Sequence, residues 1–134
     1  SAVQLEVGTL VSDFEHEHIK TTLAKCQRYF WQQAFPNDKY IATAYIVSTT
    51  VSTGPYAFPV TMRAVPTGGV FGTTLFELDH AGTETQSSNM TFAGNTESTG
   101  ALVMTVSSGL TAGQAGVIQG GTAGNAGLTA SAEL

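Results

Sequence analysis

The sequence predicts an α+β fold that is mainly β, with one N-terminal amphipathic helix packed on an antiparallel, jelly-roll-like β-sandwich. Two patterns support this class. Apolar residues recur at helical spacing only before residue 36, and from residue 39 onward they alternate with polar residues as in a strand. Short apolar segments then follow one another between Gly, Asn, Ser and Thr residues, which is typical of sandwiches and jelly rolls. The 134 residues suit a single domain, divided into an N-terminal strand and linker (1–12), a helix (13–35) and a sandwich (39–134).

The N-terminal segment favours a strand, because Val3, Leu5 and Val7 alternate with polar residues over residues 1–7. The chain opens in this strand without a methionine. We therefore expect it to be a fragment or a processed product of a longer protein. No basic segment followed by an apolar one, as in a signal peptide, is present at residues 1–8.

A capping box, Ser12 followed by Glu15, predicts that a helix begins there. We expect this helix over about residues 15–33, with Pro36 and Asn37 ending it. Its apolar side chains are spaced four, three and four residues apart, which places them on one stripe. We expect that stripe to pack on the sheet through Ile19, Leu23, Cys26 and Phe30.

Residues 39–51 are rich in Ile, Val, Thr and Tyr and predict one long strand. Both of its faces carry apolar side chains, so we expect burial on both sides by the helix, a second sheet or another subunit. A turn is predicted at residues 53–55. Pro59 suggests that the next strand, 56–65, is an edge or contains a bulge. Further strands are predicted at 70–78, 89–93, 101–106, 115–119 and 128–134.

The composition restricts the classes of partner. Charged residues make up 11% of the chain, against roughly 25% in an average soluble domain. Because interface cores are depleted of charge, we expect partner subunits to cover part of the surface in a homo-oligomer. The net charge of −5 and five basic residues scattered along the sequence argue against nucleic-acid binding. No apolar run approaches a membrane span, and a single cysteine allows no internal disulfide.

Four segments share their order and spacing with a known module: residues 2–8 (AVQLEVG) leading to 13–16 (DFEH), 26–30 (CQRYF), 58–67 (FPVTMRAVPT) and 132–134 (AEL). The chain thereby resembles a widespread module of tailed-bacteriophage virion proteins, often the C-terminal part of tail fibres. The second and third segments are the most specific. They are consistent with a scaffold, because Met62 would face the core, Arg63 would point away and Pro66 would end the strand. Arg28 could reach a carboxylate or a backbone carbonyl.

The resemblance implies a phage virion structural protein, made in the host cytoplasm. It would be a fibre or attachment component that contacts the host surface, with other virion proteins and host glycans as partners. By analogy with fibre modules, it would assemble as a homotrimer. Two alternatives remain open. One is a capsid decoration (head-fibre or cement) protein, which would hold the shell together. The other is a glycan-degrading depolymerase domain.

No catalytic, cofactor-binding or metal-binding residue is assigned, and we expect the chain not to be an enzyme. His16 and His18 flank Glu17, a spacing that separates two ligands on a helix. Cys26 lies on the apolar stripe, where a packing role is favoured over a nucleophilic one. No nucleophile elbow occurs, and residues 68–72 (GGVFG) lack the Gly-Lys-Ser/Thr ending of a phosphate loop.

Two groups of residues could take part in cleaving or binding a carbohydrate, but no ligand-binding residue is assigned. Carboxylates of the sheet region could form a glycosidase pair, but solvated loop acids are the favoured interpretation. Trp31 and Tyr29 could stack on a sugar, but the edge of the core is the favoured interpretation. The sequon at Asn89 carries no weight in a phage protein. The carboxylates in question are Glu77, Asp79, Glu84 and Glu97. His80, beside Asp79, is the third histidine and would have to fold back onto the helix to share a metal with the other two.

Overall fold

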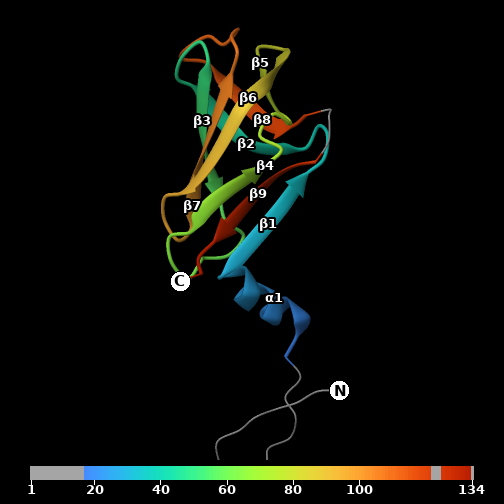
Figure 1. Cartoon of the computed structure of the whole chain (residues 1–134), viewed down its shortest axis with the longest axis vertical. Coiled ribbons are helices and arrows are strands. Elements are labelled where there is room, and N and C mark those ends of the chain that lie inside the picture. The colour runs from blue at the N-terminus through green and yellow to red at the C-terminus, as the bar shows by residue number, and fades with distance from the viewer. Residues whose placement is uncertain (1–16, 122–124, 134) are drawn as a thin grey trace, which may run out of the picture.

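The computed structural model describes residues 17–121 and 125–133 (Figure 1). The strand predicted at 1–7 and the capping box at Ser12 and Glu15 lie outside these residues. Within the described residues, one helix is followed by nine strands: α1 (Ile19–Gln27), β1 (Phe30–Phe35), β2 (Tyr40–Ile46), β3 (Val51–Ala57), β4 (Thr67–Phe71), β5 (Phe76–His80), β6 (Thr83–Gly94), β7 (Thr99–Val106), β8 (Ala115–Gly120) and β9 (Ala126–Ser131).

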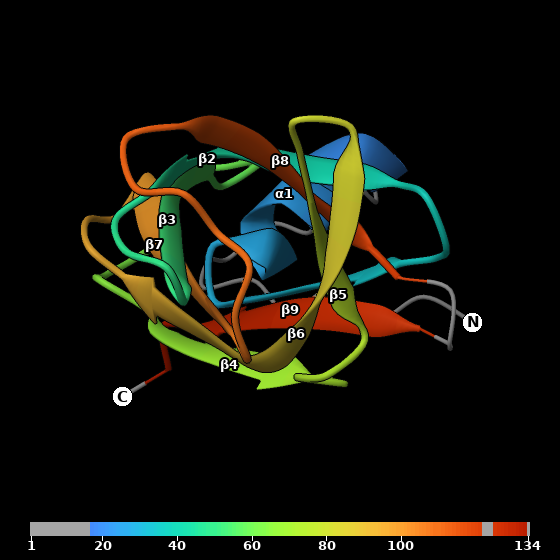
Figure 2. The same cartoon turned by 90° about the horizontal axis from the view of Figure 1, so that it is seen from above.

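Six of the strands close into a barrel in the order β2-β3-β7-β6-β5-β8, and every neighbouring pair is antiparallel. The other three form a separate antiparallel sheet, β1-β9-β4. Figure 2 shows this sheet on the side of the molecule opposite β2 and β8. The expectation of a mainly β, antiparallel fold is therefore confirmed. The predicted sandwich is corrected to a closed barrel covered on one side by a three-stranded sheet.

Long, irregular strands make the closure possible. The first half of β6 pairs with β5, up to Gln86, and the second half pairs with β7. A register shift between Ser87 and Asn89 separates the two halves. A second shift, between Tyr40 and Ala42, interrupts the pairing of β2 with β8. Because bulges bend and twist a strand, they allow one ribbon to turn from one side of a barrel to the next.

The core fills the inside of the barrel with alternate side chains of each strand. In β7, every second residue from Gly100 to Val106 is buried, and the residues between them are half-exposed. Side chains of a strand point alternately to its two faces, so a strand with one buried face shows this alternation of buried and half-exposed residues. The prediction of strands from residue 39 onward used the same alternation. Side chains with no exposed surface come from five strands of the barrel: Ile46, Ser52, Phe76, Leu78, Leu102, Met104 and Ile118.

An aromatic cluster joins the three-stranded sheet to the barrel. The ring of Trp31 in β1 lies 5.3 Å from Tyr56 and 6.3 Å from Phe58, between ring centres. Phe92 of β6 lies 5.8 Å from both Tyr56 and Phe58. Gly68 of β4 brings the sheet close to β6: a Cβ there would lie 2.2 Å from the Phe92 carbonyl oxygen. The sheet and the barrel thus share one continuous core.

The predicted helix is wrong in its length and in its buried stripe. α1 ends at Gln27, and none of its residues is buried. Ile19 is 78% exposed and Leu23 is 55% exposed, while Cys26 and Phe30 are also exposed. The last residues of the expected helix, from Phe30 onward, belong to strand β1, which pairs with β9 along its whole length. Aromatic residues at 30, 31 and 35 favour a strand, and pairing with β9 decides the conformation.

The single long strand predicted at residues 39–51 is a hairpin. β2 and β3 are joined by a turn in which Val47 donates its N–H to the Val51 carbonyl at 2.9 Å. Within the described residues one face of β2 is left open, because Tyr45 is exposed whereas Ala44 and Ile46 are buried; coverage of that face by another subunit stays a prediction. The turn predicted at residues 53–55 lies inside β3. Thr and Pro are turn formers in isolation, but here pairing with β7 keeps them extended.

Two other predicted strands are also corrected. Of residues 56–65, only the first two belong to a strand; the rest form a loop that inserts Phe58 and Met62 into the core. Residues 70–78 divide into β4 and β5 at Gly72, whose φ of 67° ends β4. The strands predicted at 89–93, 101–106, 115–119 and 128–134 correspond to β6, β7, β8 and β9, with residue 134 outside the described part.

Among the described residues, no helix is long and apolar enough to cross a membrane.

Candidate functional site

The histidines and the cysteine lie apart in the described part of the chain. His18 caps α1, accepting a hydrogen bond at Nδ1 from the Lys20 N–H at 3.2 Å. His80 is buried in the barrel, with Nε2 3.4 Å from the Gly109 carbonyl oxygen. Cys26 is exposed on α1, so the expectation that it is buried is wrong. Residues 17–121 and 125–133 contain no group of three or more potential metal ligands, and His16 lies outside them.

Three of the four candidate carboxylates lie together on the outside of the barrel. Asp79 of β5 is directly opposite Glu84 of β6. Glu77 precedes Asp79 by two residues in β5 and therefore lies on the same face of the strand. Gln119 of β8 donates to Glu84 Oε1 at 3.0 Å. These acids lie on strands, so the interpretation as loop residues is wrong for them. Only Glu97 lies in a turn, where its carbonyl accepts from the Met62 N–H at 2.7 Å.

Trp31 and Tyr29 have different environments. Trp31 is 4% exposed and belongs to the core, as the favoured interpretation expected, although it lies on a strand and not on a helix. Tyr29 is 46% exposed, immediately before β1. The two rings therefore do not form one stacking platform.

The two segments that carry most of the resemblance meet at one end of the molecule. Arg63 donates its N–H to the Arg28 carbonyl at 2.8 Å, which joins the loop 58–66 to the end of α1. The guanidinium of Arg63 lies over the ring of Tyr29, while Met62 is 1% exposed and faces the core. The expected opposite directions of Met62 and Arg63 are confirmed. We call this end, made of α1, residues 28–30 and the loop 58–66, the foot; it lies at the bottom of Figure 1.

The foot is both apolar and basic. Its exposed large hydrophobic side chains are Ile19, Leu23, Tyr29, Phe30 and Val65. The five basic residues are scattered in the sequence, but four of them gather here: Lys20, Lys25, Arg28 and Arg63. One of the four is paired, because Lys25 forms an ion pair with Glu17. Hydrogen bonds from Lys25 and then Thr22 lower the pKa of Glu17.

A groove lies on the outside of the barrel, where the pairing of β2 with β3 ends. β2 and β3 pair only at Tyr45–Thr53 and Ile46–Ser52. Two residues beyond the Tyr45–Thr53 pair, Pro55 would have to donate an N–H to β2, and proline has none. The ladder between the two strands therefore ends there, while β2 stays paired with β8 and β3 stays paired with β7.

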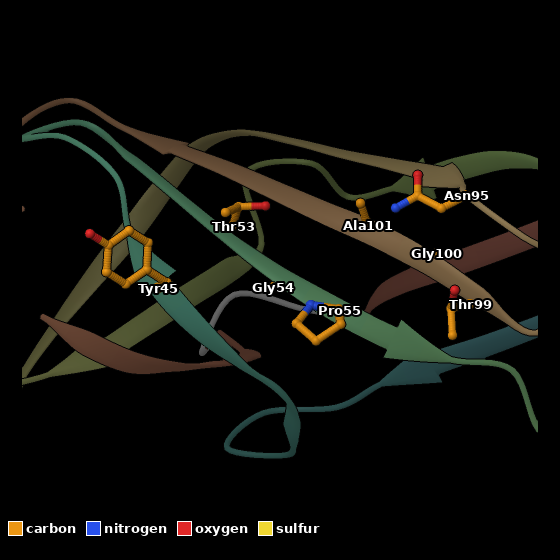
Figure 3. Close-up of a pocket in the computed structure, with 8 residues that line it drawn as sticks. All are labelled: Tyr45, Thr53, Gly54, Pro55, Asn95, Thr99, Gly100 and Ala101. Carbon is orange, nitrogen blue, oxygen red and sulfur yellow. The ribbon is translucent and has the colours of Figure 1, made fainter. Parts of the chain in front are cut away.

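The groove has a volume of about 420 Å³ and is open to solvent. Figure 3 shows Tyr45 of β2 at one end, Asn95 and Thr99 at the other, and Pro55 of β3 between them. Tyr45 is 56% exposed, and no hydrogen bond within the described residues uses its hydroxyl group. None of the lining residues is charged: they are Tyr45, Thr53, Gly54, Pro55, Asn95, Thr99, Gly100 and Ala101.

Hydrogen bonds hold the groove in shape. Thr53 donates its hydroxyl to the Leu102 carbonyl at 3.1 Å, across β3 and β7. At the Asn95 end, the Thr96 hydroxyl accepts the Thr99 N–H at 3.0 Å, and the Asn95 N–H donates to the Thr99 carbonyl at 3.0 Å. The turn that carries Asn95 is thus fixed, while no hydrogen bond among the described residues uses its side-chain amide. A rigid frame with unused polar groups is typical of a preformed binding surface.

Sequence reasoning missed this groove. Tyr45 was assigned to a strand buried on both faces, and Pro55 to a turn. The proline inside a run of β-formers was the available signal, because a proline in a strand marks a broken ladder. Which neighbouring strand loses its pairing at Pro55 depends on the strand register, and the sequence does not reveal that register.

Comparisons with models of protein families, with curated proteins and with solved structures returned no match.

Proposed function

We propose that this chain is a structural domain of a bacteriophage virion, in a tail fibre or attachment component, that contacts the host surface without catalysing a reaction. The segments that resemble the phage module supply the assignment to a virion. The supporting structural observation is that the domain carries two separate surfaces that its core does not use. One is the uncharged groove, and the other is the foot.

The foot is suited to assembly. A helix of nine residues is marginal on its own in water, and α1 buries none of its side chains within the described chain. Exposed apolar groups of this kind usually mark an interface. The foot would join further copies in a homotrimer, and its basic residues favour an acidic surface on a neighbouring virion protein.

The groove is suited to host contact, because a barrel side wall can reach a cell surface while the foot is held by the particle. Its residues are aromatic, amide and hydroxyl groups, which serve recognition more readily than they serve packing. On this proposal, the fold gives a fixed spacing between an anchored end and an exposed binding surface.

Locating the chain on purified particles tests the proposal. Mass spectrometry of particles should detect it, and gold-labelled antibody against the chain should mark tails. The isolated chain, added in excess, should slow adsorption of the same particles to host cells. Absence from the particles would contradict the proposal.

A capsid decoration protein is the nearest alternative, and the foot favours it equally, since a cement protein also needs an assembly surface. Gold label on heads, with no effect of the free chain on adsorption, would support it.

A depolymerase is the second alternative, and the facing carboxylates Asp79 and Glu84 favour it. Release of reducing sugar from host polysaccharide, lost in Glu84→Gln, would support that alternative.

A further inference from the structure

From the geometry of the groove, we infer that it binds a neutral glycan, with Tyr45 stacking on a sugar ring and Asn95 hydrogen bonding to its hydroxyl groups. The inference deepens the proposed function by naming the ligand class and the residues. It does not depend on where the chain sits on a particle, because the groove belongs to the isolated barrel.

The absence of charge selects the ligand class. All eight lining residues are uncharged. An anionic polysaccharide would lose hydration in such a groove and find no cation to replace it. A cationic ligand would likewise find no carboxylate. A polyhydroxylated neutral ligand needs no countercharge, only hydrogen-bonding groups beside an apolar surface.

The two ends of the groove supply those two kinds of contact. The exposed ring of Tyr45 offers a flat apolar face with a hydroxyl at its tip, a combination that suits the C–H face and the hydroxyl edge of a pyranose. The Asn95 amide provides donors and an acceptor, which match vicinal hydroxyls. Pro55, exposed between them, gives an apolar floor (Figure 3).

Affinity for a single sugar should be weak, because the groove is open and a ligand there keeps one side in water. Its volume of about 420 Å³ falls in the range of small-molecule sites, roughly 300–1,000 Å³. Three copies of the groove on one trimer would strengthen attachment through avidity, without any new contact. Weak single-site binding and strong attachment of particles are therefore compatible.

Nuclear magnetic resonance titration of the full chain tests the site directly. The probes are maltotriose, cellotriose, lactose and chitotriose as neutral glycans, with 3′-sialyllactose as the anionic comparison, each at up to about 50 mM to cover a millimolar Kd. At least one neutral glycan should shift the amide signals of Tyr45, Thr53 and Ala101. Shifts confined to other residues, shifts larger with sialyllactose, or no shift with any probe would overturn the inference.

Matched variants test the residue roles. Tyr45→Ala should weaken binding at least tenfold, and Asn95→Ala roughly threefold to tenfold. Tyr40→Ala and Asn89→Ala are the controls, because both residues are exposed and neither lines the groove. Equal effects of Tyr45→Ala and Tyr40→Ala would overturn the assignment. If groove binding is found but the Tyr45→Ala chain still slows particle adsorption fully, the inference stands and host contact through the groove does not.

Discussion

The guanidinium carbon of Arg63 lies 5.4 Å from the centre of the Tyr29 ring, and the Arg63 N–H bonds to the carbonyl of Arg28. These contacts join the end of α1 to the loop before β4, two segments more than thirty positions apart in sequence. They explain why the two segments occur together in one chain: each supplies half of the foot.

The contact between Arg63 and Tyr29 should be measurable by a double-mutant cycle. A cation over an exposed aromatic ring contributes about 0.5–1 kcal/mol. We expect that coupling between Arg63→Ala and Tyr29→Ala in urea denaturation. Arg28→Ala with Tyr29→Ala is the control, since the cation over the Tyr29 ring belongs to Arg63. A coupling energy of zero for the first pair would show that the stacking contributes nothing to stability.

Leucines at the foot and in the barrel should respond differently to truncation. Leu102→Ala should cost about 2–5 kcal/mol, because Leu102 has no exposed surface and the variant leaves a cavity in the barrel. Leu23→Ala should change the free energy of unfolding by less than about 0.5 kcal/mol, because this side chain is exposed. Chemical denaturation of dilute protein measures both. A large loss for Leu23→Ala under these conditions would mean that α1 packs on the barrel after all.

Gly68 should tolerate no side chain. An added Cβ would meet the Phe92 carbonyl oxygen at 2.2 Å, and backbone in the barrel cannot move aside easily. We expect Gly68→Ala to cost about 1–3 kcal/mol or more. Gly69→Ala is the matched control, because its Cβ would meet only the Thr129 hydroxyl, which can rotate away. Equal thermal stabilities of the two variants would contradict the close approach of β4 to β6.

Stability should fall at alkaline pH, partly through Tyr56. Burial raises the pKa of Tyr56 above its ordinary value of 10.0. The unfolded chain therefore loses this proton at a lower pH than the folded chain does. The contribution of Tyr56 is complete below about pH 10 and is lost as the pH rises through the folded pKa. Denaturation between pH 9 and pH 11 should show a shallower decline for Tyr56→Phe than for wild type; equal slopes for the two chains would contradict this contribution.

Light scattering should reveal association through the foot. We expect the isolated chain to approach the mass of a trimer as its concentration rises. Leu23→Asp should return it to a monomer with unchanged thermal stability, since Leu23 lies outside the core. Val47→Asp, at an exposed site on the β2–β3 turn, is the control. A monomer at every concentration would contradict self-association of the free chain.

Most strands were predictable from the sequence because their alternation reflects burial on one face only. In β7 that alternation has a single interpretation, because every second residue is buried. It failed at residues 39–51, where Tyr and Ile at both parities hid a hairpin, and at residues 28–35, where aromatic spacing fits a helix and a strand equally. Barrel closure depends on register shifts such as the one at Ser87. Such shifts are determined by how strands that are distant in the sequence pair with one another, so no local sequence pattern predicts them.

The pairing of β1 with β9 also determines how the domain would respond to tension. Phe30 is opposite Ser131, so the strand ends nearest to both termini lie side by side at the foot. A pull between the two ends of the chain would open that ladder one pair at a time, beginning at Phe30.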